Sequence, residues 1–336
     1  MGALWLSAAI VKERLVKPFR ISGYVFDDAD LLVVSLGEGG HEGRGEAAGV
    51  YYLGDEADHM LAEVERVRAA VEAGITREQL RELLPPGGAR NAIDCALWEL
   101  ESRRSGTPVW KLAGLPSTRP LVTTFTLGAD DPEVMAQGAR DYAQASSLKL
   151  KLTGEADIDA ARVRAVRAAR PETWMAVDAN QGYTIDGLDP LVAVLVDCDV
   201  KLLEQPLARG READLQGYRS PIPIAADESA LGLADVAGLV GRFDVLNIKL
   251  DKCGGLTEGL MMAAEARRLG LGVMVGNMVG TSLAMAPAFV LGQHCDIVDL
   301  DGPIFLLADR DPGVVYADGR VWCGDEVWGA VDTAGA

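Results

Sequence analysis

Three carboxylates follow short apolar runs at nearly equal distances along the chain. Asp178 and Glu204 are 26 residues apart, and Glu204 and Asp227 are 23 residues apart. Each distance fits one strand–helix unit, so the three residues would end consecutive parallel strands and converge. Unpaired carboxylates brought together repel, so we expect a hard divalent cation between them, Mg²⁺ first and Mn²⁺ as the alternative. Any one of them alone could instead cap a helix.

Three lysines lie in equally apolar surroundings. Lys149 and Lys151 are two residues apart in Leu-Lys-Leu-Lys-Leu, so on a strand they share one face. Lys249 lies four apolar runs later, which in a closed eight-stranded barrel is the opposite wall. We predict Lys151 and Lys249 to be catalytic. Lys149 would support them, because its positive charge favours a neutral, basic Lys151 amine.

These residues together indicate a reaction class. A cation that chelates a carboxylate, with an amine on each face of the bound molecule, fits removal of the proton α to that carboxylate. The product of this step is an enediolate, which then takes up a proton. Delivery of that proton to the opposite face inverts the carbon. The pattern therefore predicts an isomerase, a racemase or epimerase that works by 1,1-proton transfer.

Eight apolar runs could bring these residues together. Amphipathic helical segments separate them, among them 155–169, 230–240 and 256–269. Alternation of this kind predicts a parallel α/β sheet, and eight successive runs favour a closed barrel. An open doubly wound sheet is the alternative, but no G-x-G-x-x-G follows the first run. The expected strands are 122–127, 148–152, 175–177, 201–203, 222–226, 245–250, 273–275 and 297–300.

The first third of the chain has a mixed α+β pattern. Segments 4–16 and 31–36 are rich in strand-forming residues, whereas 56–73 and 89–104 have helical spacing. Five glycines between positions 37 and 45 are expected to break the segment that follows the second strand. We predict a small domain that ends near Gly114.

Composition limits the classes of partner. The chain has 32 Lys and Arg against 50 Asp and Glu, a formal net charge of −18, which repels nucleic acid and anionic membrane surfaces. No apolar run approaches the roughly 20 residues that span a bilayer, and the apolar start lacks the positive charges of a signal peptide. The five cysteines show no C-x-x-C spacing, which favours reduced packing residues. We expect a cytoplasmic enzyme, and a homo-oligomer is left open.

An ordered set of motifs resembles the enolase superfamily, specifically its muconate-lactonizing branch. The matching motifs are Lys-Leu-Lys at 149–151, Asp-Ala-Asn at 178–180, Glu-Gln-Pro at 204–206, Ala-Asp-Glu-Ser at 226–229 and Asn-Ile-Lys-Leu-Asp-Lys at 247–252. The resemblance implies an α+β capping domain over 1–114, a (β/α)7β modified TIM barrel over 115–308 and a segment over 309–336 that returns to the cap. The mandelate-racemase branch, with its histidine base, is not supported, because none of the three histidines ends a barrel run.

Within this branch, Asp-Leu-Asp-Gly-Pro at 299–303 resembles the dipeptide epimerases, including L-Ala-D/L-Glu epimerases. The resemblance implies that Asp299 and Asp301 hold the ammonium group of a dipeptide substrate. Thr124, Asn277 and Met278 resemble positions that line the pocket. The stretch 90–98 also resembles these epimerases, and we interpret it as packing within the cap.

Other functions of the same scaffold stay open. N-acylamino acid racemase, o-succinylbenzoate synthase and muconate cycloisomerase use the same lysines and metal, but their substrates offer nothing for two aspartates to bind. A non-catalytic, metal-binding barrel is the alternative from another class. It predicts that a ligand or a lysine is lost, and the sequence retains all of them.

One departure from the family concerns substrate specificity. In acidic-dipeptide enzymes a loop of the cap carries a basic residue, but segment 21–43 here contains no Lys or Arg. It contains Asp27, Asp28 and Asp30 instead. We therefore hypothesise that the second residue of the dipeptide is cationic, with an apolar side chain as the alternative. A dipeptide with an acidic second residue remains an alternative, because Arg20 lies just before the segment.

Overall fold

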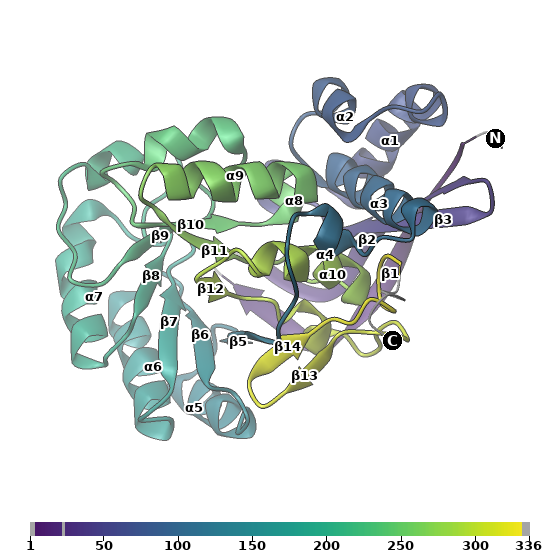
Figure 1. Cartoon of the computed structure of the whole chain (residues 1–336). Coiled ribbons are helices and arrows are strands. Elements are labelled where there is room, and N and C mark those ends of the chain that lie inside the picture. Colours follow the sequence, from purple (N-terminus) through teal and green to yellow (C-terminus); the bar gives the residue numbers. More distant parts are fainter. Residues whose placement is uncertain (1–3, 22–23, 331–336) are drawn as a thin grey trace.

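An antiparallel sheet packed against helices forms the N-terminal cap of the molecule (Figure 1). The computed structural model describes residues 4–21 and 24–330. Leu32, Val34 and Leu36 alternate along the central strand and are fully buried, packing with Met60 and Ile93 of the helices. The cap elements are β1 (Trp5–Ile21), β2 (Tyr24–Glu38), β3 (His41–Ala47), η1 (Tyr51–Leu53), α1 (Ala57–Glu72), α2 (Arg77–Leu83) and α3 (Gly88–Ser105).

The glycine break expected between positions 37 and 45 is confined to a turn at Gly39 and Gly40, which have positive φ, and strand β3 follows at once. This strand pairs with β2 in a continuous antiparallel register from Leu32–Ala47 to Glu38–His41. A Cβ atom on Gly43 or Gly45 would lie 2.1 or 2.0 Å from a backbone carbonyl oxygen of α3. The glycines are therefore present because α3 packs directly on this strand, a tertiary cause that a local turn signal does not reveal.

Eight parallel strands form the barrel, in the order and number that the sequence predicts. They pair consecutively, and the N–H of Thr124 donates to the Val298 carbonyl at 3.0 Å, which joins the last strand to the first. The strands are β5 (Phe125–Leu127), β6 (Ser147–Lys151), β7 (Trp174–Asp178), β8 (Leu202–Glu204), β9 (Ile224–Ala226), β10 (Val245–Ile248), β11 (Gly272–Val275) and β12 (Ile297–Val298).

Helices cover the outside of the barrel (Figure 1). The prediction of an α-helix at 230–240 is wrong, because this segment forms a 3-10 helix. Gly232 and Gly238 disfavour an α-helix, and the buried residues Val236 and Leu239 follow the three-residue repeat of a 3-10 helix. The connecting helices are α5 (Pro132–Asp141), α6 (Ala156–Ala169), α7 (Ile185–Asp197), η2 (Glu212–Leu215), η3 (Leu233–Leu239), α8 (Leu250–Cys253), α9 (Leu256–Arg268), α10 (Ser282–Gly292) and η4 (Gly302–Phe305).

The helix α3 joins the cap to the barrel, in agreement with the packing role expected for residues 90–98. The buried Arg90 guanidinium donates to Glu258 of α9 at 3.0 Å. The Trp98 indole N–H donates to the Thr257 hydroxyl at 2.9 Å, and the Thr257 N–H donates to Asp94 at 3.0 Å. These contacts fix the cap over the barrel mouth.

The chain after the barrel contacts both the barrel and the cap. Strands β13 (Val315–Ala317) and β14 (Arg320–Trp322) extend β4 (Leu121–Val122), which lies between α4 (Val109–Leu112) and the barrel. Further on, Arg44 of β3 donates to the Val327 carbonyl, and the Trp328 indole N–H donates to the Arg44 carbonyl at 3.0 Å. The three-part division at residues 114 and 308 remains our proposal.

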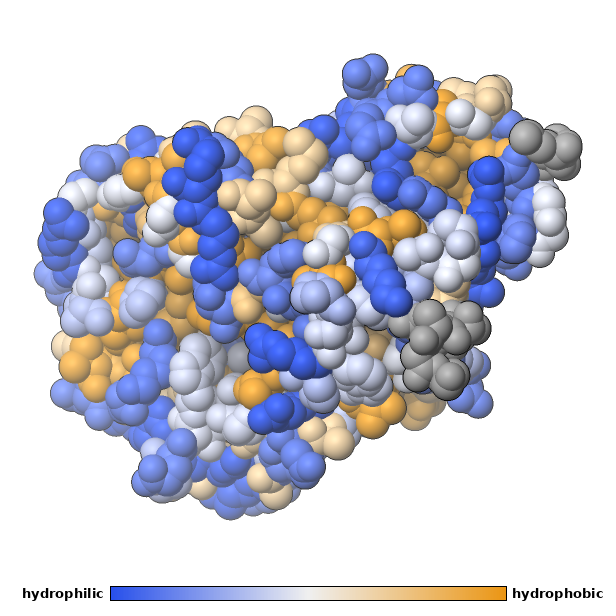
Figure 2. Space-filling view, in the orientation of Figure 1, coloured by the Kyte–Doolittle hydropathy of each residue, from blue (hydrophilic) through white to orange (hydrophobic). Residues whose placement is uncertain are grey.

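Polar and apolar residues are interspersed over the face shown in Figure 2. A search of the described helices finds none that is both long and apolar enough to cross a membrane.

Candidate active site

The three predicted carboxylates meet at the carboxyl end of the barrel. Asp178 ends β7, Glu204 ends β8 and Asp227 directly follows β9, and all three are buried. One carboxylate oxygen from each lies within 4.8 Å of the other two. Three convergent, buried carboxylate oxygens are a donor set that suits a hard divalent cation such as Mg²⁺. The residues present therefore fit the expected metal.

Lys149 is buried next to this cluster, and its side chain is 1% exposed. Its Nζ is 2.7 Å from both Glu204 Oε2 and Asp299 Oδ2. Burial alone would lower the pKa of Lys149, but the carboxylates of Asp299 and Glu204 raise it well above its usual value. Lys149 is therefore a fixed positive charge between two carboxylates.

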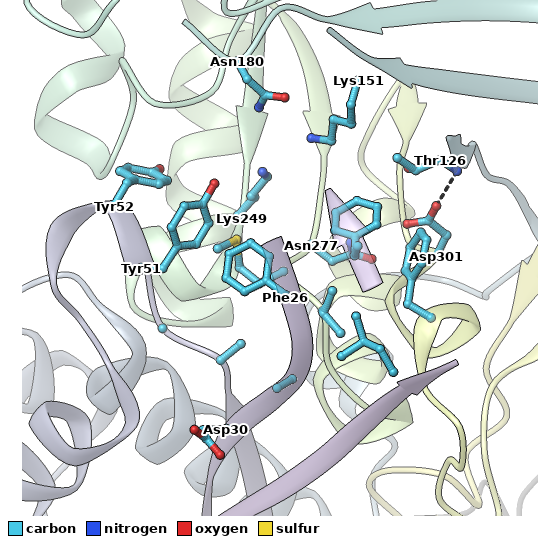
Figure 3. A pocket seen from close by; sticks show the side chains of 18 of the residues that line it. Phe26, Asp30, Tyr51, Tyr52, Thr126, Lys151, Asn180, Lys249, Asn277 and Asp301 are labelled. Carbon is cyan, nitrogen blue, oxygen red and sulfur yellow. Dashed lines mark hydrogen bonds between the residues drawn. The ribbon is translucent and has the colours of Figure 1, made fainter. Parts of the chain in front are cut away.

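Lys151 and Lys249 enter the same cavity from β6 and from the end of β10 (Figure 3). The Lys151 amine lies 2.7 Å from Asp178, and the Lys249 amine lies 2.7 Å from Asp227. Burial opposes the charged form of Lys249, yet Asp227 raises its pKa above the usual value. Two amines on different walls face one enclosed space.

Lys252 is a buried charged residue of this site that the sequence analysis missed. It lies in α8, 2% exposed, and its Nζ is 2.6 Å from Asp227 Oδ1 and 3.1 Å from the Asn247 carbonyl oxygen. Burial works against ionisation of Asp227, but Lys249 and Lys252 hold its pKa well below the usual value. The quoted motif at 247–252 contains Lys252, so a second lysine in that motif, three residues after Lys249, was the available signal.

Two further residues of the cavity, the half-buried Asn180 and the buried Glu228, were also missed. Asn180 Oδ1 and Glu228 Oε2 lack a hydrogen-bond partner among the described residues. Burial, followed by the charge of Asp227, raises the pKa of Glu228 to about 8. Asn180, two residues after Asp178, has a positive φ of 43°, a conformation that asparagine adopts more readily than most residues. Both residues belong to motifs that the sequence analysis quoted without assigning them a role.

Asp301 of the aspartate pair lies on the opposite side of the cavity from Tyr51 and Tyr52 (Figure 3). Asp299 follows β12, accepts a short hydrogen bond from the Thr124 hydroxyl and pairs with Lys149. Asp301 accepts from the Thr126 N–H at 2.7 Å. Burial and the neighbouring Asp299 raise the pKa of Asp301 to about 7.

The remaining expected pocket residues differ in their positions. Asn277 and Met278 line the cavity, and the Asn277 side-chain oxygen accepts from the Gly302 N–H at 3.0 Å. Thr124 holds Asp299 from deeper in the barrel. The threonine that lines the cavity is Thr126, two residues further along the same strand face.

The cavity between cap and barrel has a volume of about 340 Å³. Of the three aspartates proposed for specificity, Asp28 and Asp30 line it, and Asp27 does not. Lys12 of β1 lies 3.2 Å from Asp28 and 3.3 Å from Asp30. The sequence analysis missed this partner, because it is brought opposite the aspartates by pairing of β1 with β2.

Known proteins share this architecture. Residues 6–114 match the family model described as mandelate racemase / muconate lactonizing enzyme, N-terminal domain, and residues 133–323 match the model described as enolase C-terminal domain-like. The chain is 37% identical to L-Ala-D/L-Glu epimerase of Escherichia coli K12 over 304 residues, which is 90% of this chain and 95% of that protein.

Solved structures agree with this relationship. An enolase family member from Agrobacterium tumefaciens, with bound sodium and L-Ala-L-Glu, has a TM-score of 0.92 and 41% identity, covering 97% of this chain and 100% of that one. A dipeptide epimerase from Methylococcus capsulatus, complexed with Mg and L-Arg-D-Lys, has a TM-score of 0.89 and 29% identity, covering 96% and 97%. The chain belongs to the enolase superfamily, in the mandelate racemase / muconate lactonizing enzyme family.

Proposed function

We propose that the protein is a Mg²⁺-dependent dipeptide epimerase, an isomerase that inverts the α-carbon of the C-terminal residue by 1,1-proton transfer. The observation that carries this proposal is one cavity lined by Lys151 of β6, by Lys249 at the end of β10 and by the Asp299–Asp301 pair. Asp227 of the three-carboxylate cluster lines the same cavity. The relatives compared above are themselves described as epimerases or as similar to them.

Asp178, Glu204 and Asp227 would hold the metal, which when bound stabilises negative charge on the substrate carboxylate. Lys151 and Lys249 would then act on the two faces of the α-carbon. One neutral amine takes the α-proton, the electrons of the C–H bond delocalise into the carboxylate to give an enediolate, and the other ammonium returns a proton to the opposite face. The number of bound protons is unchanged, so each turnover leaves the two lysines with exchanged protonation states.

Asp299 and Asp301 would bind the ammonium group of the dipeptide. Asp301 is buried in the cavity wall and receives a hydrogen bond from the Thr126 N–H, which leaves acceptor capacity for a cation. An N-acylamino acid, o-succinylbenzoate precursors and muconate lack such a cation and would face two carboxylates. The two aspartates therefore disfavour N-acylamino acid racemase, o-succinylbenzoate synthase and muconate cycloisomerase.

The remaining expectations accompany this proposal. We expect the enzyme to work in the cytoplasm without nucleic acid or membrane partners, given its net charge of −18, and we leave a homo-oligomer open. The second residue of the dipeptide would be cationic or apolar, since neither Lys nor Arg occurs in segment 21–43.

Hydrogen exchange at the α-carbon tests the proposal. The protein is incubated with Mg²⁺ in D₂O and a small set of L,L-dipeptides, and NMR follows loss of the α-proton and appearance of the diastereomer. We expect both signals at the C-terminal residue, and EDTA should abolish them. If Mg²⁺ raises the melting temperature but no dipeptide exchanges, the proposal is refuted and a non-catalytic, metal-binding barrel becomes the better description.

A further inference from the structure

The cap supplies an aromatic wall to the cavity, which we define as Phe26, Tyr51 and Tyr52. The Phe26 and Tyr51 rings are 5.1 Å apart at 68°, and the Tyr51 and Tyr52 rings are 5.2 Å apart at 90°. Edge-to-face contacts of this kind hold the rings in defined orientations. All three side chains are only partly buried although they pack on one another, so part of their apolar surface faces the cavity.

The aromatic wall lies beside Lys249 (Figure 3). A buried carboxylate fixes this arrangement, because Asp251, two residues after Lys249, accepts hydrogen bonds from the N–H groups of Ala48 and Gly49 at 2.8 and 3.1 Å. Ala48 and Gly49 precede η1, which carries the tyrosines. The wall is therefore held in register with one of the two proposed bases.

This placement indicates which part of the substrate meets the wall, provided that the proposed function is correct. The lysines must flank the α-carbon that is inverted, and Asp301 would hold the ammonium group at the other side of the cavity (Figure 3). The side chain of the second residue leaves the same α-carbon. It therefore projects next to Lys249, where the aromatic wall stands.

The acidic residues of the cap are less suited to bind a substrate cation than the sequence implied. Phe26, Asp28 and Asp30 alternate on one face of β2, and Asp30 lies beyond Phe26 on the side away from Lys249 (Figure 3). Lys12 pairs with both aspartates, so their charges are already compensated in part. All three side chains are 42 to 58% exposed, where solvent screens any remaining charge.

An acidic side chain also lacks a suitable partner here. The cations among the described lining residues are Lys149, Lys151 and Lys249, and each is paired with a buried carboxylate. Arg20 is exposed and does not line the cavity. Arg209 lines a separate pocket on the other side of Tyr52 and does not line this cavity. A negative charge on the cavity side of the aromatic wall would therefore lose hydration without gaining an ion pair from the lining residues.

We propose that the second residue of the dipeptide carries a large uncharged side chain, aromatic or branched aliphatic, that packs on Phe26, Tyr51 and Tyr52. Such a side chain exchanges water for the ring surfaces and needs no charged partner. We expect kcat/KM for L-Ala-L-Phe and L-Ala-L-Leu to exceed that for L-Ala-L-Ala, L-Ala-L-Lys and L-Ala-L-Glu by about tenfold or more.

The test measures kcat/KM for epimerisation of these five dipeptides in the full-length protein with Mg²⁺. Highest activity with Ala-Phe or Ala-Leu supports the proposal. Highest activity with Ala-Lys would overturn it in favour of the aspartates, and highest activity with Ala-Glu would overturn it in favour of a cation elsewhere. In both of these cases the proposed epimerase function survives. Failure of every dipeptide to exchange would refute the function itself.

Two variants separate the aromatic wall from the aspartates. Phe26→Ala should lower the ratio of Ala-Phe to Ala-Ala activity by about tenfold, and Phe26→Leu, which keeps an apolar side chain, should restore most of the ratio. Lys12→Ala frees both aspartates and should raise the ratio of Ala-Lys to Ala-Phe activity. Lys17→Ala, at another exposed position of the same strand, is the matched control. Unchanged ratios in both Phe26 variants would overturn the proposal.

Discussion

Replacing Lys252 with methionine probes the charge balance of the buried site. Lys252 and Asp227 are each 2% exposed, and the amine donates to the Asp227 carboxylate at 2.6 Å and to the Asn247 carbonyl at 3.1 Å. Methionine keeps much of the side-chain volume and removes the charge. The variant therefore leaves an excess negative charge on the cluster that we assign to the metal.

The size of the effect follows from burial. Removing one partner of a buried ion pair costs about 3–5 kcal/mol, because the other charge remains desolvated and uncompensated. A divalent cation among the same carboxylates would replace part of the missing positive charge. A ligand present at a hundred times its Kd stabilises the native state by about 2.7 kcal/mol. We expect this stabilisation to be larger in the variant than in the parent protein by about 1 kcal/mol or more.

Denaturant unfolding in EDTA and in saturating Mg²⁺ measures both numbers. Lys252→Met should lose about 3–5 kcal/mol in EDTA and clearly less with Mg²⁺. Lys201→Met is the matched control, since Lys201 forms an exposed ion pair with Asp199 that solvent screens, so its loss should change the stability little with or without Mg²⁺. Equal losses with and without Mg²⁺ would show that Lys252 is not coupled to a metal at Asp227, and our reasoning would be wrong.

Three further outcomes follow from the structure. Lys151→Ala and Lys249→Ala should each slow epimerisation by about 10²–10⁴-fold. In D₂O, NMR should show that one variant still exchanges the α-proton of the L,L-dipeptide and the other variant that of the L,D-dipeptide. Normal epimerisation in either variant would contradict the assignment. Because an ammonium group needs the ionised form of Asp301, whose pKa is raised to about 7, kcat/KM should fall as the pH drops below about 7, and Asp301→Asn should remove this acid limb from the pH profile. Gly45→Ala should lower the melting temperature, since its Cβ would lie 2.0 Å from a carbonyl oxygen of α3, whereas Gly238→Ala, with nothing within 4 Å, should not; equal melting temperatures would argue against the tight contact.

The barrel strands and the carboxylates could be predicted because their signal is local and repeated. Each strand of a parallel barrel is buried on both faces, so it appears as an apolar run, and a polar residue at its end points to the mouth. Asp178, Glu204 and Asp227 show both features. Their convergence then follows from the barrel topology alone.

The features that could not be predicted depend on partners distant in sequence. Gly43 and Gly45 have the composition of a turn, and only the packing of α3 on β3 shows that they belong to a strand. Asp28 and Asp30 are acidic by sequence, but Lys12, on a neighbouring strand, changes their electrostatic character. Lys252 lies in a short helix whose burial comes from the surrounding barrel rather than from a periodic pattern.

The contacts between the end of the chain and the cap also bear on how the protein folds during synthesis. The Arg44 side chain and the Val327 carbonyl are 283 residues apart, and the Gly329 N–H reaches Glu99 across 230 residues. Closing loops of this length slows the formation of native contacts. The cap is made first, yet its packing is complete only after these late residues have left the ribosome. During that interval the edge of β3 near Arg44 stays uncovered, and unprotected strand edges are sites of aggregation in nascent chains.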